Sequence, residues 1–393
     1  MWLRNLSVIF SIVLLTACQT SAVNTSYNSN YENFDRYSQP IDQPASVISR
    51  NDKGDLWQVT RTNLKFNKFH IKARVKAEIT SYNRYPPHMT AVSKQASPYY
   101  YYVLKEVLER GLPSEVALIP VIESLYDPNA YSYGKASGIW QIIPSTAKYL
   151  GLKINNWYDG RRDLIHSTDT ALDYLERLNK RFKGDWMLTF AAYNGGGGTV
   201  SKAMRINREK GLPTDYWSLK LPKETTRYVP KILAVAALVK SPKKYKIELP
   251  SIANVPVFNI VKIKGQVDLN KAASLAKLDR SVIDQFNPGF NRGVTSPNGP
   301  FRLLIPVHKA QKLQRALSQL NQKKAGEYGA FEIKSAVSLG PITAHKVHKI
   351  NNGDTVWDIA KKHKLSVKEI LAFNGISENT TLRIGASIKI PTG

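Results

Sequence analysis

One glutamate in an apolar run is the residue best suited to acid–base chemistry. Glu123 lies in the segment 119–125, IPVIESL, near the end of a helix that the sequence predicts to begin at Pro113. Apolar surroundings disfavour the charged form of a carboxyl, so the group can hold a proton near neutral pH and donate it to a leaving oxygen. The alternative is a glutamate on the solvent face of an amphipathic helix. Pro120, which lacks an amide donor, is expected to bend this helix.

Three further patches follow Glu123 along the chain. They are GIWQIIP at 138–144, AYNG at 192–195 and ETTRYVP at 224–230. Gly138 gives backbone freedom ahead of Trp140, and Gln141 offers both an amide donor and an acceptor. Trp140 suits a core position as well as a ligand-binding surface.

Together with Glu123-Ser124, these patches resemble the family 1 lytic transglycosylases in order and spacing. The resemblance covers residues 110–240 and implies a lysozyme-like catalytic domain. It implies cleavage of the β-1,4 bond between N-acetylmuramic acid and N-acetylglucosamine in peptidoglycan, leaving 1,6-anhydromuramoyl ends. Glu123 would carry out both proton transfers, and neither a cofactor nor a metal is expected.

The resemblance also implies which residues contact the sugars. They are Ser124, Ser132, Gln141, Thr146, Tyr193, Asn194 and Tyr228. The Tyr228 hydroxyl would reach towards Glu123. Structural roles are the alternative for two of them: Thr146 is also placed to start a helix, and Tyr228 could be a buried aromatic with a satisfied hydroxyl.

A second catalytic carboxylate does not stand out in the sequence. Glycosidases that hydrolyse normally pair two carboxyl groups, but Asp127 precedes a proline, and three further aspartates sit at expected helix starts, where they would cap amides. These three are Asp159, Asp163 and Asp185. A single glutamate favours the intramolecular reaction. A lysozyme-type muramidase and a non-catalytic wall-binding protein remain as alternatives.

The elements that must position these patches are predicted to be helical. Apolar residues recur at helical spacing over 163–182, 185–193 and 224–239, without a strand signal between 112 and 245. Residues 52–110 are expected to add packing helices. The glycines Gly195–Gly198 predict a flexible turn without side chains; no Lys-Ser/Thr follows them, so they are not a phosphate-binding loop.

The C-terminal third contains an internal repeat. Val261-Lys262-Ile263 aligns with His348-Lys349-Ile350, and Phe286-Asn287 with Phe373-Asn374. Each copy predicts the order strand, helix, helix, strand. Residues 311–324 between the copies predict a helix or a linker. The fold class is therefore multidomain, with an all-α domain followed by small α+β (βααβ) modules.

The second copy resembles the LysM module, which binds N-acetylglucosamine polymers. The residues that would form its glycan groove are Gly353, Asp354, Thr355, Asn374, Gly375 and Ile376. Asp354 or Thr355 is expected to cap the following helix, and Trp357 is expected in the core. The first copy lacks the Gly-Asp-Thr signature and is interpreted as a degenerate module that packs against the helical domain.

The N-terminus predicts a lipoprotein signal. An apolar stretch at 6–15 ends in Leu15-Thr16-Ala17-Cys18, and Cys18 is the one cysteine of the chain. This pattern resembles a lipobox, with Cys18 acylated as a membrane anchor and Gln19 favouring the outer membrane and the periplasm of a Gram-negative bacterium. An ordinary secretory signal is the alternative.

The charge and the domain order complete the interpretation. With 56 Lys and Arg against 30 Asp and Glu, the net charge of +26 favours an anionic partner. No arginine-rich run occurs, so nucleic acid is not expected, and peptidoglycan strands are the expected partner. The predicted order is signal 1–17, tether 18–51, N-terminal helices 52–110, catalytic domain 111–247, first module 251–307, linker 308–343 and LysM module 344–392.

Overall fold

The computed structural model describes most of the chain after residue 53. The described residues are 54–85, 87–263, 265–324, 345–363, 365–374, 376, 382 and 384–391. Cys18, the expected signal and tether at 1–51, and Gly375 lie outside them.

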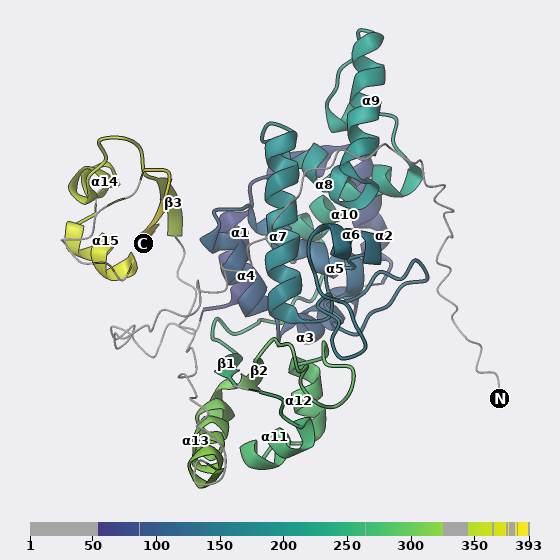
Figure 1. The fold of residues 1–393 in the computed structure, drawn as a ribbon. Coiled ribbons are helices and arrows are strands. Elements are labelled where there is room, and N and C mark those ends of the chain that lie inside the picture. The colour runs from purple at the N-terminus through teal and green to yellow at the C-terminus, as the bar shows by residue number, and fades with distance from the viewer. Residues whose placement is uncertain are drawn as a thin grey trace, which may run out of the picture.

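A helical domain accounts for the described residues up to about 250 (Figure 1). Its helices are α1 (Leu56–Asn63), α2 (Ala73–Asn83), α3 (Pro87–Ala96), α4 (Tyr100–Glu109), α5 (Ile119–Ser124), α6 (Pro144–Tyr149), α7 (Leu164–Arg181), α8 (Trp186–Gly195), α9 (Gly197–Glu209) and α10 (Lys223–Lys240). Short 3-10 helices are η2 (Asn67–Ile71), η3 (Ser114–Leu118) and η4 (Tyr216–Ser218). The described part of this region holds isolated bridges but no strand, as the sequence predicted.

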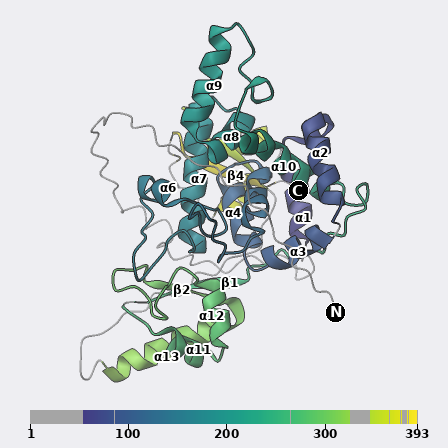
Figure 2. The same ribbon diagram turned by 90° about the vertical axis from the view of Figure 1, so that its right-hand side faces the viewer.

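Helix α10 lies at the centre of the helical domain. Every residue from Ile232 to Val239 is buried, and the helix packs against α2 and α8. A helix that is apolar all round must be covered on every side. Figure 2 shows α7, α8 and α10 grouped together, with α9 projecting beyond them. The helix that follows the glycines, α9, had no counterpart among the predicted elements.

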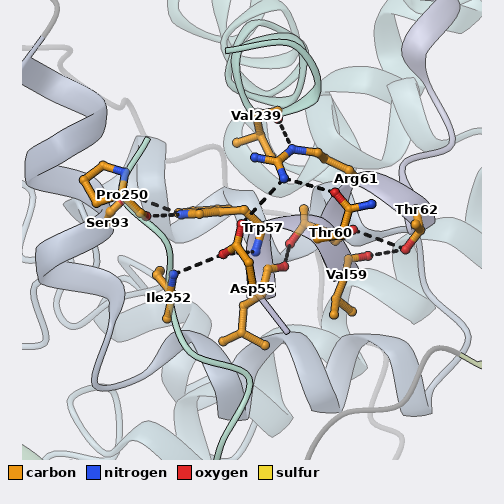
Figure 3. Close-up of polar contacts among 12 residues, drawn as sticks. Asp55, Trp57, Val59, Thr60, Arg61, Thr62, Ser93, Val239, Pro250 and Ile252 are labelled. Carbon is orange, nitrogen blue, oxygen red and sulfur yellow. Dashed lines mark hydrogen bonds and ion pairs between the residues drawn. The ribbon is translucent and has the colours of Figure 1, made fainter. Parts of the chain in front are cut away.

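The N-terminal helix α1 forms hydrogen bonds with the end of α10 and with the segment that follows it (Figure 3). The Asp55 carboxylate accepts from the amide of Trp57 and from the amide of Ile252, both at 3.1 Å. Arg61 Nε donates to the carbonyl of Val239 at the end of α10, at 2.8 Å. These bonds join the start of the described chain to residues nearly 200 positions later.

Both C-terminal copies have the predicted βααβ order. The first contains β1 (Phe258–Lys262), α11 (Leu269–Ala276), α12 (Arg280–Phe286) and β2 (Arg302–Pro306); the second contains β3 (His345–Lys349), α14 (Val356–Lys362), α15 (Val367–Asn374) and β4 (Ser387–Pro391). Each pair of strands is antiparallel. The elements keep the register of the sequence repeat, so the alignment of the two copies is confirmed.

One asparagine performs the same task in both modules. Asn287 Nδ2 donates to the carbonyl of Leu304, and Asn287 Oδ1 accepts from the Leu304 amide, both at 2.8 Å. Asn374 makes the same pair of bonds to Lys389, at 2.6 and 2.7 Å. An amide side chain can donate and accept at once, so each asparagine fixes the second helix to the last strand.

The first module shares a core with the helical domain. Phe258 of β1 lies 5.8 Å from Tyr102 between ring centroids, and it belongs to the same buried cluster as α4 and α10. Buried Arg302 of β2 forms an ion pair of 2.6 Å with Asp163 at the start of α7. Helix α13 (Val307–Lys324) covers β1 and α11. Residues 311–324, predicted as a helix or a linker, are therefore helical and pack on this module.

The second module touches the helical domain near the end of α4. Lys389 Nζ lies 3.0 Å from a Glu109 carboxylate oxygen, and Val347 lies against Gly111. The expectation that Trp357 belongs to the core is wrong, because its side chain is 59% exposed. Helix α14 buries Ile359 and Ala360 instead, and Lys361 Nζ lies 4.8 Å from the Trp357 ring centroid.

Candidate active site

Glu123 lies in the last turn of the short helix α5. The expected single helix from Pro113 is in fact two: 3-10 helix η3, then α5 with Pro120 in its first turn. Pro120 therefore starts a helix, where its missing amide donor costs nothing, rather than bending one. Leu125 and Tyr126 both take left-handed backbone conformations, with φ of 54° and 64°. The chain turns away directly after Ser124, which leaves Glu123 at the end of the helix.

Helix α10 supplies the polar surroundings of Glu123. Tyr228 donates its hydroxyl hydrogen to Glu123 Oε1 over 2.6 Å, as the motif implied. Burial raises the pKa of Glu123 to about 7; the Tyr228 bond lowers it, the charge of Glu224 raises it and that of Lys231 lowers it. A carboxyl with this pKa is populated in both protonation states at neutral pH, as an acid that must later act as a base requires.

Glu224 was not among the site residues predicted from the sequence. Among the described carboxylates, it is the one whose charge acts on Glu123. Its spacing from Tyr228 and Lys231 is i, i+4 and i+7, so all three lie on one face of α10. That helical spacing was present in the sequence and could have identified Glu224.

The four aspartates that could have supplied a second catalytic carboxylate have other partners. Asp127 accepts from the amide of Asn129, and Asp159 pairs with Arg161 at 2.7 Å. Asp185 caps α8, and Asp163 caps α7 while it pairs with Arg302. Capping is therefore confirmed for Asp163 and Asp185.

The loop 138–142 forms hydrogen bonds both with α5, the helix of Glu123, and with α8. Ser124 Oγ donates to the carbonyl of Ile139 at 3.0 Å, and the Tyr193 hydroxyl donates to the carbonyl of Trp140 at 3.0 Å. Trp140 itself is fully buried, with Nε1 donating to Thr168 Oγ1. Trp140 is thus a core residue, and its backbone holds the tyrosine in place.

Gln141 and Ser132 stabilise the hairpin that leads into this loop. Gln141, at φ 47°, donates Nε2 to the carbonyls of Ala130 (3.2 Å) and Gly138 (2.8 Å). Ser132 Oγ accepts from the amide of Ala136 at 3.0 Å. Gly138 is obligatory, since a Cβ there would lie 1.9 Å from the carbonyl oxygen of Arg161. Thr146 lies half-buried in α6, and α6 has no side-chain cap.

Asn194 connects α8 to the first turn of α10. Its Nδ2 donates to Glu224 at 3.2 Å, and its Oδ1 accepts from Thr225 Oγ1 at 2.8 Å. The two polar patches 192–195 and 224–230 therefore meet at this pair of helices. Asn194 of α8 therefore lies beside Glu224 of α10, the helix that also carries Tyr228.

The four glycines do not form a flexible loop. Gly195 ends α8, Gly197 begins α9, and Gly196 alone lies between them, at φ 82°. A Cβ on Gly195 would lie 2.6 Å from Thr225 Oγ1, so Gly195 allows α8 to approach α10 closely. Gly198 faces open space inside α9.

The candidate groove of the second module is braced from within. Thr355 caps α14 by accepting from the amide of Asp358 at 3.1 Å. Asp354 accepts from the Asn351 amide at 2.8 Å and hydrogen-bonds with His348 at 2.9 Å, while Gly353 takes φ 88°. Ile376 packs against the module core. The Asn374 side chain is occupied by backbone groups of Ile370 and Lys389.

Comparisons with known proteins agree with this arrangement. Residues 105–214 match the Transglycosylase SLT domain, 257–322 the LysM-like domain of lytic transglycosylase MltD, and 348–391 the LysM domain. The expected fold class, a helical domain followed by LysM-type modules, is confirmed. Among solved structures, the 70 kDa soluble lytic transglycosylase of Escherichia coli is 23% identical and covers 36% of this chain and 24% of its own, at a TM-score of 0.31.

Relatives in sequence cover far more of the chain. The membrane-bound lytic murein transglycosylase D of Escherichia coli is 33% identical over 395 residues, which span 98% of this chain and 85% of the relative. A second Escherichia coli strain carries a protein that matches to the same extent. This chain belongs to the family of membrane-bound lytic murein transglycosylase D.

Proposed function

We propose that this lytic murein transglycosylase uses Glu123 as both the acid and the base of peptidoglycan cleavage. The observation that carries the proposal is the pairing of Glu123 with Tyr228 at 2.6 Å, in surroundings that raise the pKa of Glu123 to about 7. The bond cleaved is the β-1,4 linkage between N-acetylmuramic acid and N-acetylglucosamine.

The reaction needs two proton transfers at one carboxyl group. Protonated Glu123 gives its proton to the glycosidic oxygen, which leaves C1 of muramic acid with the bonding electron pair. The resulting carboxylate then accepts the proton of the muramoyl C6 hydroxyl while that oxygen bonds to C1. A 1,6-anhydro ring forms, Glu123 is protonated again, and no water is consumed.

The nearby groups have supporting roles in this proposal. Tyr228 stabilises the carboxylate stage by donating a hydrogen bond to the charged form. Glu224 opposes that charge and keeps the acid stage populated. Its position on α10, bonded to Asn194, suits this role better than that of a nucleophile. Ser124, Ser132, Gln141, Thr146, Tyr193 and Asn194 are proposed to line the sugar sites.

The modules and the N-terminus would hold the enzyme on its substrate. The loop Gly353-Asp354-Thr355, with the residues around Ile376, is proposed to bind N-acetylglucosamine units. Acylated Cys18 is proposed to anchor the chain in the outer membrane, facing the periplasm. Weak modules and a tether raise the local concentration of enzyme at the wall without a high-affinity contact. Within the described ranges, no helix is long and apolar enough to cross a bilayer.

Digestion of purified sacculi tests the proposal. A chain that begins after Cys18 is incubated with sacculi, and the soluble fragments are analysed by mass spectrometry. Anhydromuramoyl ends are expected, and Glu123→Gln should release none. Reducing ends would indicate a muramidase, and no release by the unmodified chain would indicate a binding protein. Asp127→Asn serves as the control carboxylate and should retain release.

A further inference from the structure

A hollow on the first module lies between β1 and α13, away from Glu123 and its partners. Its volume is about 690 Å³, and its lining comes from Asn259 of β1 and from one side of α13. Figure 1 and Figure 2 both show β1 and β2 on the side of the module nearest the helical domain, with α13 on the far side. This hollow is called the β1–α13 groove below.

Helix α13 carries two different stripes of side chains. Ala310 and Leu313 are fully buried in the core of the module, and Leu317 packs against that core. The polar residues that line the groove follow one another at i, i+3, i+4, i+7 and i+8, so they form a second stripe on the same helix. They are Gln311, Gln314, Arg315, Ser318 and Gln319. One helix therefore closes the module core and lines the groove.

Asn259 is a buried polar residue on the core-facing side of β1. Residues two apart in a strand share a face, and Val261 of this face belongs to the module core. The side chain of Asn259 is 8% exposed, and its Oδ1 atom has no hydrogen-bond partner among the described residues. A buried acceptor without a partner destabilises the fold. An N–H group supplied by a ligand in the groove would remove this cost.

The equivalent position of the second module is different. In the sequence repeat Asn259 aligns with Lys346, and their partners on the last strands, Ile305 and Ile390, correspond as well. Lys346 is exposed, whereas α13 packs on β1 beside Asn259. The buried acceptor is therefore particular to the first module, and it occurs where α13 adds a wall.

The chemistry of the lining suits a peptide better than a sugar. Asn259 and three glutamines carry amide groups that donate and accept at once, as the backbone of a peptide does. Arg315 is the one cation among the described residues of the lining, and no carboxylate accompanies it. A guanidinium can bind a carboxylate through two parallel hydrogen bonds. The described lining also contains no aromatic ring, the rigid apolar surface on which a sugar could stack.

We propose that the β1–α13 groove binds the peptide attached to the glycan of peptidoglycan. Asn259 Oδ1 accepts from an amide of the peptide, the glutamines of α13 bond to its backbone, and Arg315 pairs with one of its carboxylates. Phe258, next to Asn259, belongs to the main core, so the groove is fixed to the helical domain. A peptide bound there would hold its strand in one position relative to the enzyme. This inference rests on the peptidoglycan substrate of the proposed function, but not on the role of Glu123.

Binding to two parts of the substrate tests the proposal. An amidase separates purified sacculi into peptides and peptide-free glycan strands. Titration calorimetry measures the affinity for each, with a chain that begins after Cys18 and carries Glu123→Gln. Arg315→Ala should raise the Kd for the peptides about tenfold, because a charge-assisted pair is lost, and leave the Kd for glycan unchanged. Lys312→Ala removes an exposed cation of α13 outside the groove and should change neither Kd.

Asn259→Leu separates a ligand role from a structural one. Leucine keeps a branched side chain and removes the unpaired acceptor, so the temperature of thermal unfolding should stay the same or rise. The Kd for the peptides should rise about fivefold, since a peptide amide then has no acceptor at this position. A lower unfolding temperature with an unchanged Kd would show that Asn259 acts in the fold alone, against the proposal.

Three further results would overturn the peptide groove. They are no binding of the peptides when the groove is unmodified, equal weakening by Arg315→Ala and Lys312→Ala, and weakening for the glycan strands instead of the peptides. The last result would identify a sugar site. None of the three concerns Glu123, because its role is tested separately by the anhydromuramoyl ends.

Discussion

At the scale of single residues, the protonation of Glu123 is set by opposing effects from its surroundings. Burial and the charge of Glu224 favour the neutral acid, while Tyr228 and Lys231 favour the carboxylate. The balance places the pKa of Glu123 at about 7, so small changes in any of these groups should shift the pH dependence of cleavage.

Removal of the Tyr228 hydroxyl should move the alkaline limit of activity upwards. In Tyr228→Phe the carboxylate loses its hydrogen bond, so the pKa of Glu123 rises above about 7 and the acid form persists to higher pH. The shift should be about one pH unit, the size expected for a bond to a charged group. It is measured from the pH profile of kcat/KM. Tyr101→Phe, which removes a buried hydroxyl without a partner among the described residues, should leave the profile in place.

The raised pKa also predicts that the charged form of Glu123 destabilises the fold. The folded state binds the proton of the Glu123 carboxyl more tightly than the unfolded state does. The stability that this proton gives is therefore complete below pH 4.5 and is lost as the pH rises through about 7. The free energy of unfolding of Glu123→Gln should therefore exceed that of the unmodified chain by about 2 kcal/mol at pH 8, allowing for partial solvent exposure of Glu123. At pH 4 the two free energies should be nearly equal. Urea unfolding at the two pH values measures this. A difference independent of pH would contradict the assigned cause.

At the scale of elements, the close approach of α8 to α10 holds the site together. Gly195 allows this approach, because any side chain there would meet Thr225. The contact places Asn194 beside Glu224 and fixes the first turn of α10, one turn before Tyr228.

Gly195→Ala should separate these helices and lower activity. The added Cβ would lie within 3 Å of two Thr225 atoms, so we expect destabilisation of about 1–3 kcal/mol and at least tenfold lower kcat. Thermal unfolding and initial rates measure both. Gly198→Ala is the control, since its Cβ meets nothing within 4 Å inside α9, and it should stabilise the chain by about 0.5–1 kcal/mol. The same response from both variants would refute the role of Gly195.

Much of this element structure could be predicted from the sequence. Helical periodicity located α7, α8 and α10, and the repeat alignment located both βααβ modules in register. The 3-10 helix before Pro120 was missed because η3 and α5 share one apolar run. Helix α9 was missed because Gly196–Gly198 resemble a turn. Trp357 was misplaced because the face of so short a helix depends on its packing partners.

At the scale of the whole molecule, the first module is a structural part of the enzyme. Its Phe258 and Phe286 join the main core, and its Arg302 enters the helical domain as the partner of Asp163. Although burial alone would raise it, Arg302 and His166 lower the pKa of Asp163 to about 2. This long-range pair could not be foreseen, because nothing in sequence links positions 139 residues apart.

Loss of this ion pair should destabilise the whole chain. Arg302→Met leaves the carboxylate of Asp163 buried without its cation, which costs about 3–5 kcal/mol. The loss should be smaller near pH 3, where Asp163 can take up a proton. Arg280→Met breaks an exposed ion pair with Asp284 and a hydrogen bond to Asn270, and it should cost about 1 kcal/mol or less. Denaturant unfolding of both variants makes the comparison, and equal costs would mean that the first module and the helical domain are not coupled through Arg302.

The most direct test of the central claim follows the oxygen atoms of the product. Sacculi are digested in water labelled with oxygen-18, and the muramoyl ends are analysed by mass spectrometry. If the muramoyl C6 hydroxyl attacks C1 with Glu123 as acid and base, the 1,6-anhydro ends should carry no label. Glu123→Gln should produce no such ends. Labelled reducing ends, or unlabelled anhydro ends that persist in Glu123→Gln, would contradict the account.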